Sequence, residues 1–258
     1  MQSAFWVPLV RDVITVTGAD AATFLHSQVS QDVASMEAGD SRNAFVLEPA
    51  GKITSIVRIT RGGLDRFVID TEPGFGDATL ARLSRFKIRV DADMELTTQT
   101  WRAIRGLRDT NVSGGIPAWR MDNTAFDVFA SSAAMPNAIP EGTPELFHAE
   151  RLRAAWPLMG VDVAHDMIPA ETPIVESAVS FTKGCYPGQE LVERMDSRGS
   201  RAPKSLVVVS CSSDVRPGDP VMVGDESVGV YTSIAEVDER TIAFALVKRG
   251  IAPDDIRH

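Results

Sequence analysis

The hydrophobic pattern of the chain changes near residues 200–203, and this change constrains the fold more than any other feature of the sequence. Before it, segments that alternate apolar and polar side chains are mixed with helical segments. After it, short alternating strands are separated by turns rich in Gly, Pro and Asp. The sequence therefore predicts an α+β fold followed by a small antiparallel β-barrel.

Individual elements follow from local signals. Helices are expected to start at Asp20, Asp77 and Thr143, where a capping side chain precedes the helical segment. The first is expected to end near Gln31, and the third near Trp156, before a proline. Strands are expected at residues 13–16, 45–47, 53–60, 66–70, 94–105 and 125–129, and in the barrel at residues 206–211, 220–223, 228–232 and 241–247.

The charge balance argues against a nucleic-acid partner. The 258 residues include 26 basic and 35 acidic side chains, a formal net charge of −9, whereas a general nucleic-acid binder needs a basic surface to meet phosphates. No segment approaches the roughly 18 consecutive apolar residues of a membrane helix. Residues 1–8 lack the basic and apolar regions of a signal peptide. We therefore expect a cytoplasmic protein without a membrane partner.

The inventory of metal ligands is small. The chain has two cysteines, Cys185 and Cys211, and four scattered histidines. It has neither a C-x-x-C nor an H-E-x-x-H motif, so one chain cannot assemble a four-ligand zinc site or hold a [4Fe–4S] cluster by its own thiolates. Two cysteines are also too few for a disulfide framework.

Reactive chemistry is expected in the octapeptide Lys183-Gly184-Cys185-Tyr186-Pro187-Gly188-Gln189-Glu190. Pro187 suits the first position of a short helix, which would place Cys185 just ahead of a helix N-terminus and two residues after Lys183. Both features favour the thiolate, so we expect the pKa of Cys185 to lie below the free value of about 8.5.

The other side chains of the octapeptide suit ligand binding. Tyr186 could stack on a flat heterocycle, and Gln189 and Glu190 could form hydrogen bonds at the same mouth. On position alone, a single Cys in a turn is more often a small buried hydrophobe, and a single Tyr is more often a packing residue. The residues by themselves leave both interpretations open.

The octapeptide also resembles a family signature. Lys-Gly-Cys-Tyr-x-Gly-Gln-Glu looks like the signature of the YgfZ-type folate-binding proteins, which are relatives of the glycine-cleavage T-protein and include the mitochondrial iron–sulfur assembly factors. Further blocks similar to the family follow one another in the expected order, at residues 16–21, 47–52, 150–151, 160–162, 168–171 and 216–221.

The resemblance implies a three-lobed ring of the T-protein type that binds tetrahydrofolate or a derivative in its central hole. The first lobe would be discontinuous, with residues 1–46 and 143–200. Residues 47–142 would form the second lobe, and residues 201–258 would form the barrel.

The resemblance also implies roles for residues outside the octapeptide. Glu171 stands at the family's matching carboxylate, which would accept the two parallel N–H donors of a pterin edge. A helix-capping or surface role for Glu171 stays open. Arg151 and Arg194 could meet the glutamate carboxylates of folate or brace the site, although on position alone each is more often a structural or surface residue.

The sequence departs from the aminomethyltransferases of this superfamily after Gly51. Those enzymes carry a paired Asp soon after the corresponding glycine, whereas the segment at residues 52–56, Lys-Ile-Thr-Ser-Ile, has no acid. The nearest carboxylates, Glu48 and Asp65, are out of register, and a slip of one residue turns a strand side chain to the other face. Aminomethyl transfer is therefore disfavoured.

The role that the resemblance then implies is assistance in the assembly or repair of [4Fe–4S] clusters in client enzymes. Client or scaffold proteins would be the partners. Cys185 and Lys183 would be the reactive residues, and Cys185 could supply one ligand to a cluster shared with a partner. Two alternatives stay open: a folate-dependent aminomethyl or methyl transferase, and a folate sensor without chemistry, which would tolerate the loss of Cys185 but not of Glu171.

Overall fold

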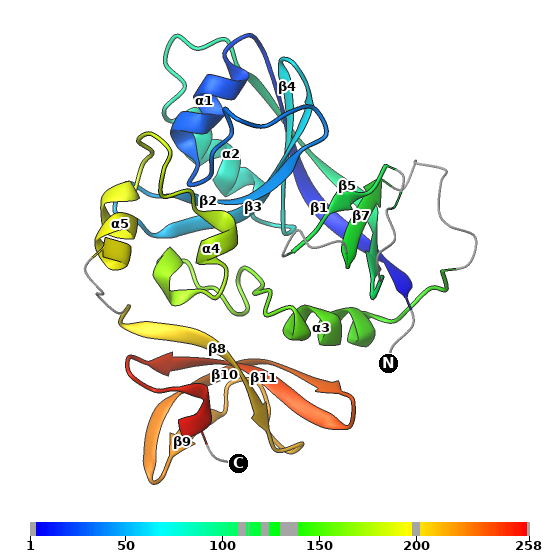
Figure 1. Cartoon of the computed structure of the whole chain (residues 1–258), viewed down its shortest axis with the longest axis vertical. Helices are drawn as coiled ribbons and strands as arrows, with labels where there is room; N and C mark the ends of the chain where they lie inside the picture. The colour runs from blue at the N-terminus through cyan, green and yellow to red at the C-terminus, as the bar shows by residue number, and fades with distance from the viewer. Residues whose placement is uncertain are drawn as a thin grey trace.

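The computed structural model describes residues 4–107, 112, 114–119, 124–129, 139–197 and 202–256. Two antiparallel sheets organise these residues, with helices packed around the larger sheet and the smaller sheet at the C-terminal end of the chain (Figure 1). Among the described residues, no helix is long and apolar enough to cross a membrane.

The larger sheet is built around β1, which pairs with β4 on one side and with β5 along its whole length on the other. Its strand order is β2-β3-β4-β1-β5-β7-β6. The strands are β1 Phe5–Thr17, β2 Ser41–Leu47, β3 Ile53–Gly63, β4 Arg66–Thr71, β5 Asp93–Arg105, β6 Ile116–Pro117 and β7 Ala125–Phe129. The predicted strands of this region are thus confirmed, with β1 starting much earlier than expected.

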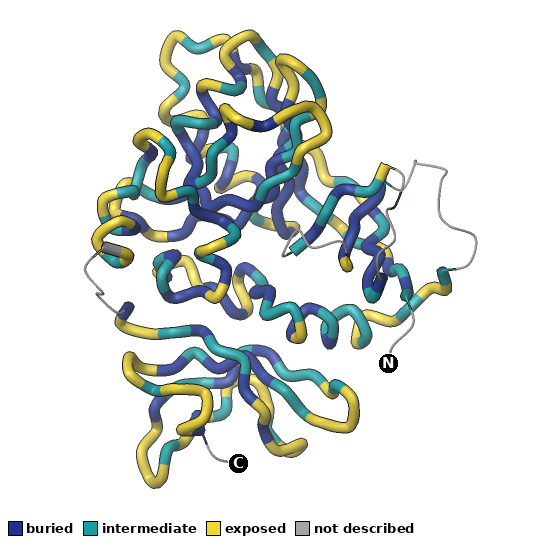
Figure 2. The backbone as a smooth tube through the Cα atoms, viewed as in Figure 1, coloured by how far each residue is buried: buried dark blue, intermediate teal, exposed yellow. Residues whose placement is uncertain are grey.

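Both faces of this sheet are covered at β2 and β3, so successive side chains enter two different cores. Val46 and Val57 belong to one core, which α1 (Ala21–Gln28) and α2 (Gly76–Ser84) complete. Phe45 and Ile56 belong to the second, which contains residues of the segment 152–192 and of the smaller sheet. Figure 2 shows the buried backbone concentrated in these strands.

The first two helices start near the predicted positions, but Asp20 and Asp77 do not cap them as expected. Asp20 does not cap α1, because its Oδ2 accepts a hydrogen bond from the backbone N–H of Asp91 at 2.9 Å instead. The helix ends at Gln28, since Val29 is already extended. Asp77 lies inside the first turn of α2, where a negative charge still complements the helix dipole.

The third predicted helix, α3, spans Pro144–Arg153 and starts as expected. Thr143 caps it by accepting a hydrogen bond from the backbone N–H of Leu146 at 3.3 Å. The helix ends before the predicted Trp156, because Ala155 adopts a left-handed conformation with φ of 50°. Short elements follow it: η1 Pro169–Glu171, α4 Val175–Ala178 and α5 Gln189–Ser197.

The smaller sheet has the strand order β8-β11-β10-β9. Its strands are β8 Lys204–Cys211, β9 Pro220–Val223, β10 Glu226–Val237 and β11 Arg240–Lys248, followed by η2 Pro253–Asp255. These strands were predicted, but their pairing is that of an open sheet with β8 and β9 at its edges, so closure into a barrel is not confirmed.

The predicted division into lobes stays a prediction. The boundary at residue 46 does not coincide with a break in the larger sheet, because β2 pairs with β3 from Ser41↔Thr60 to Leu47↔Ile53. The boundary at residue 200 lies outside the described residues.

A buried ion pair joins α3 to the smaller sheet. Arg151 donates from Nη1 to Asp162 Oδ2 at 2.6 Å and from Nη2 to Ser233 Oγ at 2.8 Å. Asp162 Oδ1 in turn accepts hydrogen bonds from the hydroxyls of Thr232 and Ser233, each at 2.6 Å. Because the side chains of Arg151 and Asp162 are 1% and 0% exposed, each charge depends on the other for its compensation.

We expect Arg151→Met to lower the free energy of unfolding by about 3–5 kcal/mol, because it leaves Asp162 as a buried charge without its cation. The matched control is Arg153→Met on the same helix, whose ion pairs with Glu150 and Asp238 lie at the surface and should contribute about 1 kcal/mol or less. Urea unfolding of the three proteins measures the difference. Equal losses in both variants would contradict the assignment.

Candidate functional site

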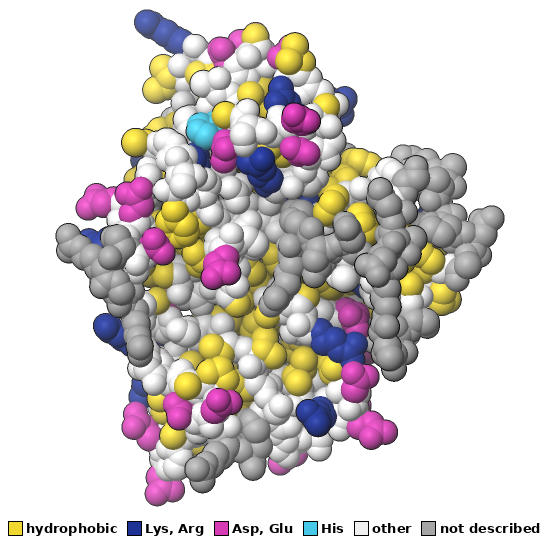
Figure 3. All heavy atoms as spheres, in the orientation of Figure 1, with side chains coloured by type: hydrophobic (Ala, Val, Ile, Leu, Met, Phe, Trp, Pro, Cys, Tyr) yellow, Lys and Arg dark blue, Asp and Glu magenta, His cyan; other side chains and the backbone are white. Residues whose placement is uncertain are grey.

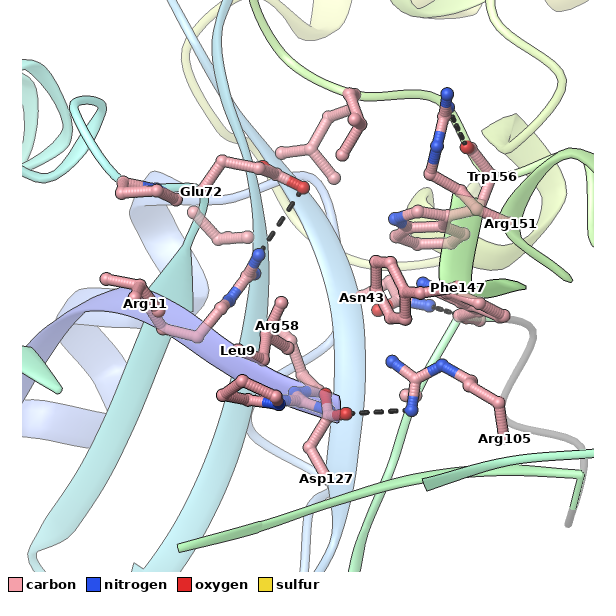
Figure 4. A pocket seen from close by; sticks show the side chains of 18 residues that line it. Leu9, Arg11, Asn43, Arg58, Glu72, Arg105, Asp127, Phe147, Arg151 and Trp156 are labelled. Atoms are coloured by element: carbon pink, nitrogen blue, oxygen red, sulfur yellow. Dashed lines mark hydrogen bonds and ion pairs between the residues drawn. The ribbon is translucent and has the colours of Figure 1, made fainter. Parts of the chain in front are cut away.

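A cavity of about 280 Å³ lies between the larger sheet and α3 (Figure 4). β1, β3, β5 and β7 contribute to its walls, together with α3 and the segment that follows it. Its charged and polar lining residues are Arg11, Asn43, Arg58, Glu72, Arg105, Asp127 and Arg151, and its aromatic lining residues are Trp119, Phe147 and Trp156.

One wall of the cavity is a ladder of alternating charges: Arg11, Asp70, Arg58, Asp127 and Arg105. Asp70 accepts from Nε of Arg11 at 2.8 Å and from Nε of Arg58 at 2.9 Å. Asp127 accepts from Nη1 of Arg58 at 2.8 Å and from Nη1 of Arg105 at 2.9 Å. Each carboxylate thus bridges two guanidinium groups.

The ladder favours the ionised form of Asp127. Burial alone would raise the pKa of Asp127, but the charges of Arg105, Arg58 and Arg11 more than offset it and lower that pKa. Burial would lower the pKa of Arg58, and the charges of Asp70 and Asp127 outweigh it, so that pKa is raised. The pKa of Arg105 is lowered, because Asp127 only partly offsets its burial.

A second part of the wall, next to Arg105, is aromatic and suits a flat ligand. The rings of Trp119 and Phe147 lie 5.4 Å apart between centroids. The guanidinium of Arg105 stands 4.0 Å from the Trp119 centroid and 5.1 Å from that of Phe147. The Trp156 ring borders the same space (Figure 4).

Several buried polar atoms at this cavity have no partner. Among the described residues, Glu72 Oε2, Arg105 Nε, Arg151 Nε and Arg82 Nη2 are buried without a hydrogen bond. All of these except Arg82 belong to residues that line the cavity. Unsatisfied buried groups are rare in folded proteins, and a ligand or bound water commonly explains them.

The octapeptide lies elsewhere: none of its residues lines the cavity. Cys185 is exposed. The ammonium of Lys183 donates to the backbone carbonyls of His26 and Val29, at the C-terminal end of α1, where a cation complements the helix dipole. Burial lowers the pKa of Lys183 to about 8, although the charges of Asp32 and Cys185 oppose that shift.

Tyr186 is 7% exposed and belongs to the second core, with the ammonium of Lys183 4.7 Å from its ring centroid. Burial, and then the charge of Glu193, raise the pKa of the Tyr186 hydroxyl. Its ring is therefore largely enclosed rather than open to solvent.

The remaining residues of the segment lie on or next to α5. The side-chain oxygen of Gln189 accepts from the backbone N–H of Tyr186 at 3.3 Å, and its amide nitrogen donates to Glu193 at 2.5 Å. Glu190 and Arg194 are exposed on the helix. The structure does not bring them to the cavity.

Close backbone contacts hold the octapeptide against the turn between β2 and β3. Gly188 has φ of 87°, and a Cβ there would lie 2.8 Å from the carbonyl oxygen of Glu48. Gly51 has φ of 83°, and a Cβ there would lie 2.7 Å from Leu191. Two blocks that are distant in the sequence are thus adjacent in space, and both glycines are required by backbone conformation and by packing.

Glu171 and Arg151 both have structural partners. Glu171 is 7% exposed, and its Oε2 accepts from the backbone N–H of Ile168 at 3.1 Å, which closes the turn at η1. It does not line the cavity. Arg151 does line the cavity, but its guanidinium is held by Asp162.

Sequence reasoning missed Arg58, Asp70, Glu72, Arg105 and Asp127. A signal was present, because Arg58, Asp70 and Asp127 interrupt strands whose other residues are mostly apolar. A charge within such a strand is buried only if it is paired. Their partners lie on other strands, so these ion pairs can be predicted only when the strand order is known.

Comparisons with known proteins identify relatives by sequence and a similar solved structure. No family model matches the chain. The tRNA-modifying protein YgfZ of Escherichia coli O157:H7 is 26% identical over 279 residues, which covers 94% of this chain and 84% of that protein. The tRNA-modifying protein YgfZ of Vibrio atlanticus is 23% identical over 236 residues, which covers 84% and 72%.

Among solved structures, the glycine cleavage system aminomethyltransferase T from Bartonella henselae superposes with a TM-score of 0.77 at 16% identity, which covers 95% of this chain and 79% of that chain. The fold is therefore that of the glycine-cleavage T-protein superfamily. Together with the relatives above, it supports the resemblance to the YgfZ-type members of that superfamily noted in the sequence.

The two glycines of the octapeptide should respond differently to alanine. We expect Gly188→Ala to destabilise the chain by at least about 1–2 kcal/mol, because of its left-handed φ and its contact with Glu48. Gly184→Ala is the matched control: no atom lies within 4 Å of its Cβ position, so its effect should stay within about 1 kcal/mol. Thermal melts compare the two variants, and similar losses would contradict the packing of Gly188.

Proposed function

We propose that this chain is a folate-binding factor that supports the assembly or repair of [4Fe–4S] clusters in client enzymes. The observation that supports folate binding best is the cavity, which combines aromatic walls with unpartnered buried polar groups. The chain shares its fold with an aminomethyltransferase of the glycine cleavage system. A bound folate would supply a carrier for one-carbon groups.

The cavity fits the head of folate rather than the whole molecule. Its volume of about 280 Å³ is close to the lower end of the range for small-molecule pockets, about 300–1,000 Å³. The flat pteridine ring suits the walls formed by Trp119, Phe147 and Trp156. In this proposal the ring enters the cavity and the glutamate tail stays outside.

The cluster-related role rests on the exposed thiol. Two cysteines in the whole chain cannot supply the four thiolates of a [4Fe–4S] cluster. Cys211 is buried, whereas Cys185 is exposed and lies two residues after Lys183. We infer that Cys185 acts together with a client or scaffold protein in the cytoplasm, as one ligand of a shared cluster.

The names of the relatives add tRNA modification to this proposal. The YgfZ proteins of Escherichia coli and Vibrio atlanticus carry the name "tRNA-modifying protein". With a net charge of −9 and acidic side chains interspersed with basic ones on the face in Figure 3, this chain is a poor match for the phosphates of RNA. We therefore propose that it supports an enzyme that modifies tRNA.

Aminomethyl transfer remains the less favoured alternative. The residues that follow Gly51 enter β3 without an acid, and Thr54 and Ser55 are buried there. The nearest carboxylate, Glu48, contacts the hydroxyl of Thr54 at 3.3 Å rather than facing the cavity.

Calorimetric titration with tetrahydrofolate tests the folate part. We expect the wild type to bind, and Trp119→Ala to weaken binding roughly 10- to 100-fold through the loss of aromatic stacking. Trp6→Ala, which removes a Trp outside the cavity, and Glu171→Ala, whose carboxylate closes its own turn, should bind like the wild type. No binding by the wild type at millimolar ligand would refute the proposal.

Replacement of Cys185 tests the cluster part. In cells that lack the native gene, a copy with Cys185→Ala should fail to restore the activity of [4Fe–4S] client enzymes, because the shared thiolate is gone. The matched control is Cys211→Ala, which changes a buried thiol in the smaller sheet and should restore the activity. Full activity with Cys185→Ala would leave the cluster role without support, while folate binding could still stand.

A further inference from the structure

Glu72 is the one carboxylate at the cavity whose pairing is incomplete. It follows the last residue of β4, lines the cavity and is 8% exposed. Among the described residues its carboxylate accepts no hydrogen bond, and Oε2 is buried without a partner. Its single ion-pair contact is Nη1 of Arg11, 3.4 Å from Oε1.

The carboxylates of the neighbouring ladder are paired at short distances, so the incomplete pairing is particular to Glu72. Asp70 and Asp127 are bound by guanidinium groups at distances of 2.8–3.1 Å. Arg11 itself makes its shorter contact with Asp70, at 2.8 Å, and not with Glu72. A buried carboxylate without hydrogen bonds costs free energy, so its retention at a cavity wall favours a binding role.

The groups across the cavity complement Glu72. The indole of Trp156 lies opposite it, with the ring nitrogen on the side that faces the cavity (Figure 4). An indole N–H only donates, and a carboxylate only accepts. A flat ligand that pairs with both would present N–H donors on one edge and an acceptor on another.

We propose that Glu72 is the specificity-determining residue of the cavity and selects a heterocycle with two adjacent N–H donors, the 2-amino-pyrimidinone edge of a pteridine head. This inference rests on the proposed folate binding and names the side chain that reads the ring. The terminal torsion of a Glu side chain is soft, so a small rotation lets both oxygens accept parallel N–H bonds. Glu171, to which the family resemblance assigns this role, accepts a hydrogen bond at η1 with one of its oxygens.

The test compares two ligands that differ only at that edge. The wild type, Glu72→Gln and the matched control Glu95→Gln, which changes an exposed Glu on β5, are titrated by calorimetry with 6-methyltetrahydropterin and with its 2-oxo counterpart. We expect the wild type and Glu95→Gln to prefer the 2-amino ligand by roughly 10- to 100-fold, the range of a charge-assisted hydrogen bond. Glu72→Gln should lose that preference.

Thermal melting without ligand adds a second readout. If Glu72 serves binding, Glu72→Gln should melt at the temperature of the wild type or higher, because it removes a poorly compensated buried charge. If Glu72 serves only to pair with Arg11, the variant should melt lower while its ligand preference stays that of the wild type, and this outcome would overturn the inference.

The outcomes separate this inference from the proposed function. Wild-type affinity and preference in Glu72→Gln would overturn the role of Glu72 and leave folate binding intact. No binding of tetrahydrofolate or the pterin by the wild type would overturn both.

Discussion

The charge ladder from Arg11 to Arg105 is the constraint on which the cavity depends. Its members come from β1, β4, β3, β7 and β5, so a single network ties most of the larger sheet together. Removal of Asp127 would leave the buried charge of Arg105 without its ion-pair partner, which typically costs about 3–5 kcal/mol. The strands cannot slide past one another without breaking these contacts, and the cavity is therefore shaped before any ligand arrives.

Strand β3 and the turn before it connect the cavity with the segment that carries the exposed thiol of Cys185. β3 carries Arg58 to the cavity, and the turn that precedes it places Gly51 against Leu191 and next to Gly188. Lys183 fastens the other end of the octapeptide to α1. Cys185 is thus displayed on a segment held at two points, separate from the cavity but supported by the same part of the sheet. A ligand and a protein partner could engage the chain at the same time.

Local patterns in the sequence predicted much of the fold. The bounds of β7 and β9 follow from alternation and turn residues alone, and the start of α3 follows from Thr143 and Pro144. The cap at Asp20 failed because its side chain bonds to Asp91, which is distant in the sequence. The cavity residues were missed for a similar reason. A charged residue in a strand is expected to face solvent unless the strand order places a partner beside it. The spacing in the octapeptide made a reactive thiol plausible, but only the family resemblance made that interpretation specific.

The charge balance of the cavity restricts what can enter it. Arg11, Arg58, Arg105 and Arg151 line it, and they are matched by Asp70, Glu72, Asp127 and Asp162. Because each guanidinium already contacts a carboxylate, the cavity offers little net attraction to an anion, although it holds several arginines. A neutral heterocycle with polar edges loses little hydration free energy when it enters the cavity. The carboxylates of a folate tail would lose their hydration, and the arginines that they would meet are already paired. The ladder therefore favours a ligand whose uncharged head is buried and whose charged end remains in solvent.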